Sequence, residues 1–479
     1  MSESWSMEEM QEVDLNDARL EARLRELLTQ LGDHPTASIP AACGGHAEMT
    51  AAYRLFDNPK TTFARILAPH IEATRRRIAA QPVVVLAQDT SEIDVTRPTQ
   101  QVQGAGPLDD GARRGLLLHP LHAFTPDGTP LGTLFATHWA REDVAVSARS
   151  LPRAQRAAIP IAKKESYRWV RTLRQAREQQ TRCPQTRIVC VCDSEADIYE
   201  LLCEAQAEPS HIDWIVRGCQ DRALQPEVGQ TATRHLRAAV LRQPVSLVQT
   251  LHVRGRDSKI AFETRGRRQP RHSRQAHVEV RSASLRLRAP RRPEGKLPAL
   301  AVNVVLVREL HPPSGDAPIE WLLLTNLPVR TNEEIRQVIQ FYCTRWMIEI
   351  FFRVLKSGCR VEERRFENLE RLQNCLALYL IVAWRTLYVC RLGRACPQIS
   401  CETIFEPAEW KAVWKIVRHA DPPHQPPTLG ELTRMVAELG GYVPRKGSPP
   451  GPQTIWIGLQ RTHDFALCWK TFGPDSQDV

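Results

Sequence analysis

Residues Phe341–Lys356, FYCTRWMIEIFFRVLK, decide how the rest of the chain is interpreted. Their apolar spacing predicts one α-helix, at about 100° per residue. With Tyr342 at zero, Arg345 falls at about 300°, Glu349 at about 340° and Lys356 at about 320°. These four side chains share one stripe roughly 60° wide, and apolar side chains fill the opposite arc. Taken alone, the stretch is compatible with a solvated helix face that carries an Arg345–Glu349 ion pair.

Two strand-like apolar runs upstream of this helix each end in an aspartate. VVVLAQD ends at Asp89, and RIVCVCD ends at Asp193. Carboxylates at the ends of adjacent strands, with a third on a packed helix, form a common cage for two Mg²⁺ ions. The sequence therefore predicts a metal-binding catalytic site built from Asp89, Asp193 and Glu349.

Length, composition and cysteine content set the outer limits. The chain has 479 residues, of which 42% are hydrophobic, and this is enough for several domains with a sizeable core. We see no apolar run as long as a membrane span, and the N-terminus MSESWSMEEMQEVD is acidic and lacks the apolar part of an export signal. The 13 scattered cysteines, an odd number, indicate reduced thiols. We therefore expect a cytoplasmic protein without a membrane partner.

The positive charge of the chain is concentrated in one segment. The formal net charge is +10, which favours a polyanionic partner. Residues 251–300 contain twelve Arg and two Lys against one Asp and three Glu, an excess of ten positive charges. A solvated face does not need so large an excess of one sign, so nucleic-acid phosphate is the expected partner.

The order of the predicted elements matches a ribonuclease H-like core. A short buried strand, a strand hairpin with a Pro126-Asp127-Gly128 turn, a helix and a second buried strand follow one another. In such a core, strands 1 and 4 lie side by side, which would bring Asp89 and Asp193 together. The elements span residues 83–89, 115–125 with 129–139, 159–179 and 187–193.

The predicted fold class is α/β: a ribonuclease H-like catalytic core interrupted by a β-rich insertion, with helical N- and C-terminal domains. A helix over residues 368–390 is apolar on most faces, so we expect it to be buried. The predicted domains are residues 1–75 (helical, DNA-end-binding), 76–200 (first part of the core), 201–331 (β-rich basic insertion), 332–394 (second part of the core, with the Glu349 helix) and 395–479 (helical, candidate dimerisation).

The spacing Tyr342-x2-Arg345-x3-Glu349-x6-Lys356 resembles the Y-R-E-K signature of one group of bacterial insertion-sequence transposases. Their nuclease is of the aspartate-aspartate-glutamate (DDE) type. The resemblance is supported by the motifs around Asp89 and Asp193, which stand in the right order, and it runs along nearly the whole chain. It implies that Asp89, Asp193 and Glu349 hold two Mg²⁺ ions, or Mn²⁺, for in-line phosphoryl transfer to water or a DNA 3′-hydroxyl.

The resemblance also implies roles for DNA-binding residues. Close members of the group release their element through a DNA hairpin with one base turned out. Tyr342, Arg345 and Lys356 would grip phosphates around that base, and Trp321 would stack on it. Arg217 matches a family arginine near the active site. From its own strand-like surroundings, Trp321 is equally compatible with a role as a core aromatic residue.

We therefore predict a cut-and-paste transposase. Its implied partners are double-stranded DNA, both terminal inverted repeats and target, and a second copy of the chain in a homodimer on DNA. Two alternatives come from other functional classes: a catalytically silent DNA-binding descendant of a transposase, and a stand-alone metal-dependent nuclease. The sequence departs from the family pattern in having Asp-Thr-Ser at residues 89–91, where Asp-Thr-Thr is commoner, and in its longer, arginine-rich insertion.

Overall fold

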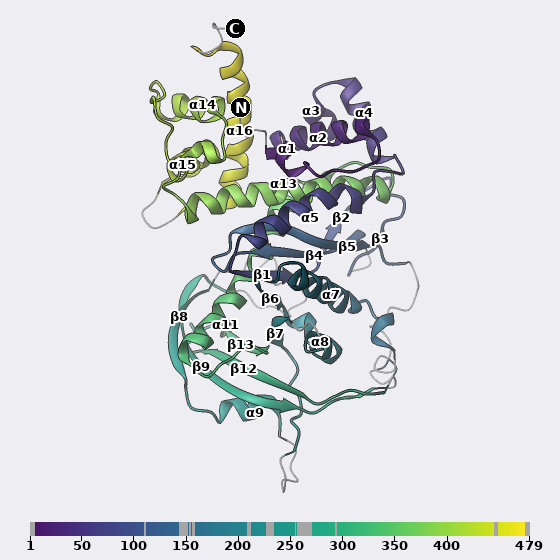
Figure 1. Cartoon of the computed structure of the whole chain (residues 1–479), viewed down its shortest axis with the longest axis vertical. Helices are drawn as coiled ribbons and strands as arrows, with labels where there is room; N and C mark the ends of the chain where they lie inside the picture. Colours follow the sequence, from purple (N-terminus) through teal and green to yellow (C-terminus); the bar gives the residue numbers. More distant parts are fainter. Residues whose placement is uncertain are drawn as a thin grey trace. The chain divides into compact units, whose positions relative to one another are not determined.

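The computed structural model describes residues 5–109, 112–142, 159–207, 212–226, 234–253, 271–292, 295–444 and 449–474, with Pro152, Gln155 and Gly255. The chain divides into two compact units, whose elements are labelled in Figure 1. The first unit comprises residues 1–84, 89–145 and 346–479, and the second comprises residues 85–88 and 146–345. Much of the predicted basic segment, namely residues 254, 256–270 and 293–294, lies outside the described residues.

The N-terminal part of the first unit is helical, as predicted, because capping residues and apolar spacing agree. Helix α2 (Ala18–Asp33) begins after Asp17, whose carboxylate accepts hydrogen bonds from two backbone N–H groups of the first turn. It buries the leucines at positions 24, 27, 28 and 31, which lie on one face. The neighbouring helices are α1 (Trp5–Glu9), α3 (Ile39–Cys43), α4 (His46–Phe56) and α5 (Phe63–Ala79).

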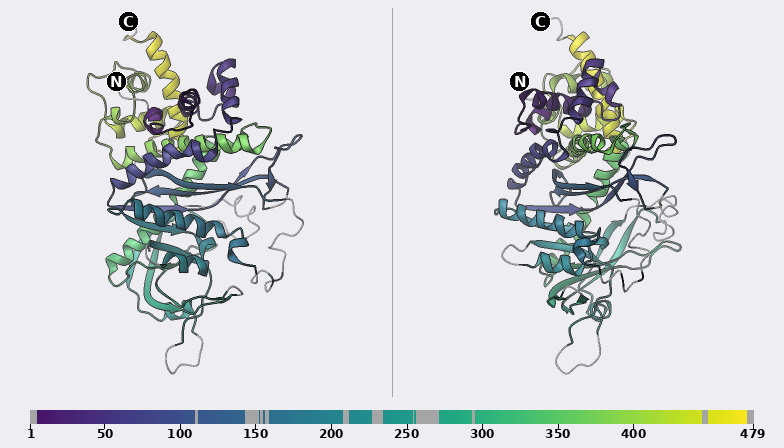
Figure 2. Two further views of the ribbon diagram at one scale, coloured as in Figure 1. Left: turned by 45° about the vertical axis from the view of Figure 1, so that its right-hand side comes forward. Right: turned by 90° about the vertical axis from the view of Figure 1, so that its right-hand side faces the viewer.

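A strand hairpin forms the sheet of the first unit. Strands β4 (Arg114–Phe124) and β5 (Pro130–Trp139) are antiparallel, and β2 (Ser91–Asp94) and β3 (Gly106–Pro107) also pair with β4. The predicted turn is present, and its Gly128 has φ +90°, a conformation that favours glycine. Helices α5 and α13 pack against β5 in this unit (Figures 1 and 2).

Helix α13 (Leu369–Ala395) is buried along most of its 27 residues, as predicted. By length and composition it could cross a membrane, which corrects the expectation that no apolar run reaches that length. However, 78% of the most apolar 18-residue stretch of this helix is buried inside the protein. A core helix of this kind gains its stability from packing on all sides and needs no polar face.

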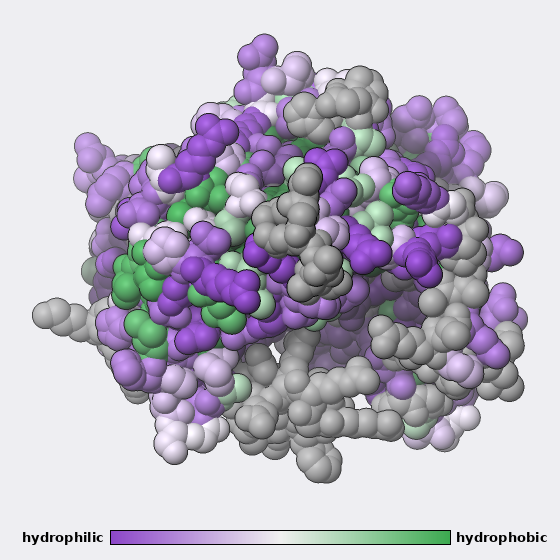
Figure 3. All heavy atoms as spheres, turned by 90° about the horizontal axis from the view of Figure 1, so that it is seen from below, coloured by the Kyte–Doolittle hydropathy of each residue, from purple (hydrophilic) through white to green (hydrophobic). Residues whose placement is uncertain are grey.

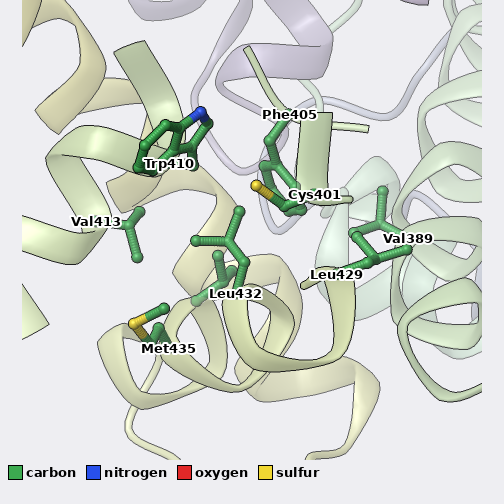
Figure 4. Packing of buried hydrophobic residues seen from close by; sticks show 9 residues of the cluster. Val389, Cys401, Phe405, Trp410, Val413, Leu429, Leu432 and Met435 are labelled. Atoms are coloured by element: carbon green, nitrogen blue, oxygen red, sulfur yellow. The ribbon is translucent and has the colours of Figure 1, made fainter. Parts of the chain in front are cut away.

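Three further helices follow α13 in the first unit. They are α14 (Pro407–Arg418), α15 (Leu429–Leu439) and α16 (Pro452–Phe472), and the predicted proline breaks lie between α14 and α15. Trp410 and Val413 of α14 pack against Leu432 and Met435 of α15 in one apolar cluster (Figure 4). The indole N–H of Trp410 donates to Glu402 at 3.0 Å, so the buried ring keeps its polar group satisfied.

A buried polar cluster joins α1 to α5 and β5 within the first unit. Arg77 donates to both carboxylate oxygens of Glu9, at 3.0 Å each, and Nδ1 of His70 hydrogen-bonds to the same carboxylate. Nε2 of His70 accepts from the backbone N–H of Thr133 at 2.9 Å, so the ring is neutral and Nδ1 is the donor. Burial lowers the pKa of His70, which agrees with this geometry. Burial acts to raise the pKa of Glu9, but the hydrogen bond from neutral His70 and the hydrogen bonds and charge of Arg77 outweigh it and lower that pKa.

The second unit is built on a mixed sheet with the strand order β1-β6-β7-β13-β12-β9-β8. As predicted, β1 lies beside β6: Nε2 of Gln88 donates to Sγ of Cys192 at 3.2 Å. Strands β6 and β7 are parallel, and each of the following pairs is antiparallel. The strands are β1 (Val83–Gln88), β6 (Arg187–Cys192), β7 (Asp213–Gly218), β13 (Glu320–Thr325), β12 (Leu300–Glu309), β9 (Arg274–Leu287) and β8 (Leu247–Val253).

Helices pack against this sheet and complete the second unit. Helix α7 (Tyr167–Arg182) and helix α11 (Asn332–Thr344) both contact β6, and α8 (Tyr199–Ala205) lies against α7. A capping box between Thr331 and Glu334 starts α11. The unit also contains α9 (Leu236–Leu241) and the small ribbon of β10 (Arg291–Arg292) and β11 (Gly295–Lys296). Most of the strands fall in the predicted insertion, although the boundaries of the five predicted domains remain a prediction.

The prediction of one helix over Phe341–Lys356 is wrong. Helix α11 ends at Thr344, α12 spans Met347–Arg353, and a π-helical turn spans Val354–Gly358. The backbone N–H of Cys359 donates to the carbonyl of Val354 at 2.8 Å, which is the i→i+5 bond of that turn. Gly358 lies against the ring of Trp456, where a Cβ would come within 3.0 Å. The ring of Trp456 thus packs on the glycine that ends the π-helical turn. Lys356 lies in this turn, so a rotation of 100° per residue does not give its angular position.

Replacement of Glu9 by glutamine is expected to destabilise the first unit by about 2–4 kcal/mol at pH 7, because Arg77 loses its buried counter-charge. The folded-state pKa of Glu9 lies below its ordinary value of 4.5, so this stabilisation is present above pH 4.5 and is lost as the pH falls toward the lowered pKa. Thermal unfolding from pH 7 to pH 3 measures the free energy of unfolding of wild type and variant. The difference between the two free energies should narrow below pH 4.5.

The matched control is Glu12→Gln, which removes the exposed carboxylate that pairs with Arg76. A surface pair of this kind contributes little, about 0–1 kcal/mol. Equal effects of the two substitutions, or a difference that does not change with pH, would contradict the role given to Glu9.

Candidate catalytic and DNA-binding site

An aromatic pair in the second unit brings together two of the predicted DNA-binding residues. Tyr342 on α11 and Trp321 on β13 make an edge contact, with ring centroids 5.2 Å apart and an interplanar angle of 63°. The guanidinium of Arg345 lies 5.8 Å from the centroid of the Tyr342 ring. Tyr342 and Arg345 are only 5% and 7% exposed, whereas Trp321 is half-buried. The accessible side chain of this group is therefore the indole.

Arg217 and Asp193 border the same phenol. Arg217 lies on β7 opposite Leu323 of β13, and its Nη2 donates to the carbonyl of Glu320 at 3.2 Å. Burial raises the pKa of Tyr342, the positive charges of Arg345 and Arg217 oppose that shift, and the charge of Asp193 adds to it. Four of the predicted site residues, Arg217, Trp321, Tyr342 and Arg345, are thus grouped at the Tyr342 ring, where the charge of Asp193 also acts.

Asp193 occupies the turn that directly follows β6. Its Oδ1 accepts from the backbone N–H of Glu195 at 2.8 Å, and the residue caps a short 3₁₀ turn at residues 194–196. This bond fixes the orientation of the carboxylate at the end of the strand. The carboxylate is half-buried, so it is held in place and still reaches solvent.

A second aspartate, to which the sequence analysis gave no role, fixes the neighbouring loop. Asp197 is buried and accepts from the backbone N–H groups of Cys219 and Gln220, each at 2.8 Å. It also accepts from Nε of Arg222 at 3.0 Å. Asp197 therefore ties the turn that begins at Asp193 to the segment that follows Arg217 on β7. The signal in the sequence was a second carboxylate four residues after Asp193.

The remaining predicted site residues belong to the first unit. Asp89 follows the end of β1, and its Oδ1 accepts from the backbone N–H of Thr90 at 2.8 Å. Glu349 lies in the first turn of α12 and is half-buried. Lys356, in the π-helical turn, pairs with Glu362 at 3.3 Å. Glu362 in turn accepts from the backbone N–H of Asp94 at 3.0 Å, so it is a further residue that the sequence analysis missed.

The three predicted metal ligands are divided between the units, with Asp89 and Glu349 in the first and Asp193 in the second. Among the described residues, no group of three or more His, Cys, Asp or Glu side chains is gathered as a metal site. Within the second unit, Gln88 contacts Cys192. Gln88 directly precedes Asp89, and Cys192 directly precedes Asp193. The assignment of the three carboxylates to one metal centre remains a prediction.

Three family models match parts of the chain. "Transposase DNA-binding" matches residues 2–61, "Transposase DDE domain" matches residues 147–385, and "Transposase Tn5 dimerisation domain" matches residues 381–470. The matches support a transposase of the DDE type that acts on DNA. They also agree with the predicted fold class, an α/β core of the ribonuclease H-like type with helical N- and C-terminal regions, which is confirmed.

Among solved structures, the chain is similar to the cryo-EM structure of the piggyBac transposase synaptic complex with hairpin DNA. The identity is 10% and the TM-score 0.33, over 72% of this chain and 54% of that chain. The match therefore spans about half the length of the piggyBac transposase. Similarity at this level carries no information about function.

Replacement of Asp197 by asparagine is expected to destabilise the second unit by about 3–5 kcal/mol, because it leaves the buried Arg222 without a counter-charge. Hydrogen-exchange mass spectrometry should show faster exchange at the amides of Cys219 and Gln220. Asp221→Asn, at an exposed aspartate of the same loop, is the control and should leave both measurements nearly unchanged. Unchanged protection of the two amides in Asp197→Asn would contradict the bracing role.

Proposed function

We propose that this chain, a transposase of the DDE type, catalyses cut-and-paste transposition of an insertion sequence. It would cleave the element at its ends through a hairpin intermediate and then join the 3′ ends to a target. The observation that carries the proposal is the cluster in the second unit, where Arg217, Tyr342 and Arg345 lie next to Asp193 and the half-buried ring of Trp321. A carboxylate next to two guanidinium groups and an accessible aromatic ring suits a phosphodiester with an unstacked base.

We propose Asp89, Asp193 and Glu349 as the catalytic residues and metal ligands. Three carboxylates offer only hard oxygen donors, which suit Mg²⁺ or Mn²⁺. The nearby thiol of Cys192 is buried against Gln88, and burial raises its pKa, so it offers no competing soft ligand. Two divalent ions bound by these residues would supply the charge that activates the attacking oxygen and stabilises the leaving one.

The cationic residues would position the phosphate. Arg217 is half-buried and held by the carbonyl of Glu320, so its guanidinium is oriented before DNA arrives. Tyr342 and Arg345 lie deeper, where they support Arg217 and Trp321 and contact the phosphate group that enters between them. Lys356 is paired with Glu362, so a phosphate that binds its ammonium exchanges one anion for another. This exchange costs less than the desolvation of an unpaired lysine.

Trp321 would hold the base that leaves the stack when the hairpin forms. Its ring is braced on one edge by Tyr342 and remains half-buried. Base–aromatic stacking contributes about 1–3 kcal/mol per base, which is of the order of the cost of unstacking. The brace by Tyr342 keeps the ring in one orientation, so little conformational entropy is lost when the base binds.

The proposed partners follow from the N- and C-terminal helical regions and from the positive net charge of the chain. The N-terminal helices would bind the terminal inverted repeats, the second unit would bind the reacting strand and target DNA, and the C-terminal helices would join two copies into a homodimer on DNA. The reaction would take place in the bacterial cytoplasm, at the nucleoid.

The first test is cleavage of labelled DNA that carries the element's terminal repeat and flank, with Mg²⁺, by wild type and by Glu349→Gln. Loss of even outer-shell partners of a metal site costs about 10–100-fold, so loss of a ligand should lower the rate at least about 100-fold. Denaturing gels separate nicked, hairpin and double-strand-break products. The control is Glu363→Gln, at a carboxylate that is mostly exposed and weakly paired with Arg360.

Three outcomes of this assay would separate the candidate functions. Nicks and a hairpin with wild type and with Glu363→Gln, absent with Glu349→Gln, support the transposase. Tight binding without cleavage in Mg²⁺ or Mn²⁺ would instead indicate a silent DNA-binding protein. Linear breaks without a hairpin would indicate a nuclease.

The second test addresses the role given to Trp321. Replacement by alanine should leave the first nick intact and slow hairpin formation by about 5- to 150-fold, the equivalent of the stacking energy of one base. Replacement by phenylalanine keeps an aromatic face and should recover part of the loss. Equal hairpin rates for all three proteins would show that the indole belongs to the strand core and does not contact the base.

A further inference from the structure

Six of the seven described arginines of the basic segment, all except Arg271, divide into two groups within the second unit. One group is already neutralised by carboxylates in the fold. Arg274 pairs with Glu309 and Asp316, Arg281 pairs with Glu279, and Arg292 pairs with Glu200. These three side chains hold the sheet and α8 together, so their charges are not available to an external anion.

The second group is exposed and has no carboxylate partner among the described residues. Its members are Arg286 near the end of β9, Arg288 just beyond it, Arg291 on β10 and Lys296 on β11. Arg291 and Lys296 stand opposite each other in the β10–β11 ribbon. We call these four side chains the Arg286 surface.

Arg286 lines a hollow of about 570 Å³ between β9, β12 and the end of α8. The other polar groups of its wall bond to one another or to backbone: Ser284 to Asn303 at 2.6 Å, Asn303 to the Leu327 carbonyl at 2.7 Å, and Gln206 to the Ala301 carbonyl at 3.0 Å. The wall is therefore fixed, and Arg286 is the charged group that it presents.

Among the described residues, the acidic side chains of the neighbouring helix α8 are already paired with arginines. On α8, Glu200 is held by Arg292, and Glu204 is held by Arg174 and Arg177 at 2.9 and 2.8 Å. The described side chains of the Arg286 surface therefore carry an excess of positive charge, which favours an anion with several charges over a single carboxylate. Seen from below, the described surface is mostly hydrophilic, with smaller hydrophobic patches (Figure 3).

The register of the sheet places this surface relative to Trp321 within the second unit. Arg286 stands opposite Ala301 of β12, and Trp321 stands opposite Val307. These two positions on β12 are six residues apart and share one face, because alternate residues of a strand point the same way. The step along β12 is about 20 Å, and the offset of about 10 Å between β9 and β13, which lie on opposite sides of β12, brings the separation to about 22 Å. This corresponds to about six base pairs of duplex.

We propose that the Arg286 surface is a second DNA contact, which holds backbone phosphates about six base pairs from the phosphodiester next to Trp321. The phosphates belong either to the element or to the DNA that flanks it. This inference rests on the proposed function only in taking DNA as the partner, since binding needs neither a metal ion nor Glu349. It also assigns Arg274, Arg281 and Arg292 to the fold and not to DNA.

The test compares Arg286→Ala/Arg288→Ala with Arg182→Ala/Arg187→Ala, a control that removes two surface arginines of the same unit that are paired with Glu178 and Asp213. Fluorescence anisotropy measures the affinity for the terminal-repeat duplex over a range of salt. Each phosphate contact contributes about 0.9 to the slope of log affinity against log salt, so the first variant should lose about 1.8 and bind at least about 10-fold more weakly at 0.1 M salt. The control should change little.

Shortened duplexes locate the contact. When either the element or the flank is cut to fewer than about six base pairs, wild type should bind that duplex no better than the variant, and the side on which this happens identifies the source of the phosphates. An unchanged salt slope in Arg286→Ala/Arg288→Ala, or a difference that survives truncation of both sides, would overturn the proposal. Wild-type binding without cleavage would refute the proposed function and leave this contact standing.

Discussion

The contact of Gln88 with two cysteines of β6 is the constraint on which the second unit depends. Its amide lies in an apolar core and donates to Sγ of Cys190 and Cys192, at 3.5 and 3.2 Å. A buried amide without a partner costs free energy, so this pair fixes β1 against β6 in one register. A slip of one residue would turn every side chain of the strand to the opposite face. The orientation of the residues that follow each strand depends on this register.

Strands β1, β4, β5 and β6 were predicted from the sequence to within about one residue at each end, because each is an apolar run bounded by charged residues, glycine or proline. The short strands β2, β3, β10 and β11 were not predicted. The prediction of one helix over Phe341–Lys356 was wrong, because periodicity assumes 3.6 residues per turn throughout. The π-helical turn at its end has Gly358 against Trp456, a residue far along the chain. The sequence pattern around Gly358 does not show that Trp456 packs there. For the same reason, the angular position predicted for Lys356 was wrong.

The candidate site shows the same division between local and distant information. The spacing of Tyr342, Arg345 and Glu349 named the residues, but not that the first two are buried or that Arg217 borders the phenol from another strand. The role of Asp197 could not be predicted from the sequence, because it depends on two backbone N–H groups that only the fold brings next to its carboxylate. Likewise, the count of arginines predicted that the partner is an anion. Only the structure shows that Arg274, Arg281 and Arg292 are paired with carboxylates of the fold, so that their charges are not available to that partner.

The discontinuous first unit has a consequence for synthesis of the chain. Helix α5 ends at Ala79, and α13, which packs against it, begins at Leu369. At about 5–20 residues per second, a ribosome needs roughly 15–60 s to make the intervening segment. The second unit, nearly continuous in sequence, can fold during this interval, while the apolar face of α5 waits for its partner. Newly made chains therefore pass through a state with exposed apolar helices, and the yield of folded protein depends on chaperones and on the temperature of expression.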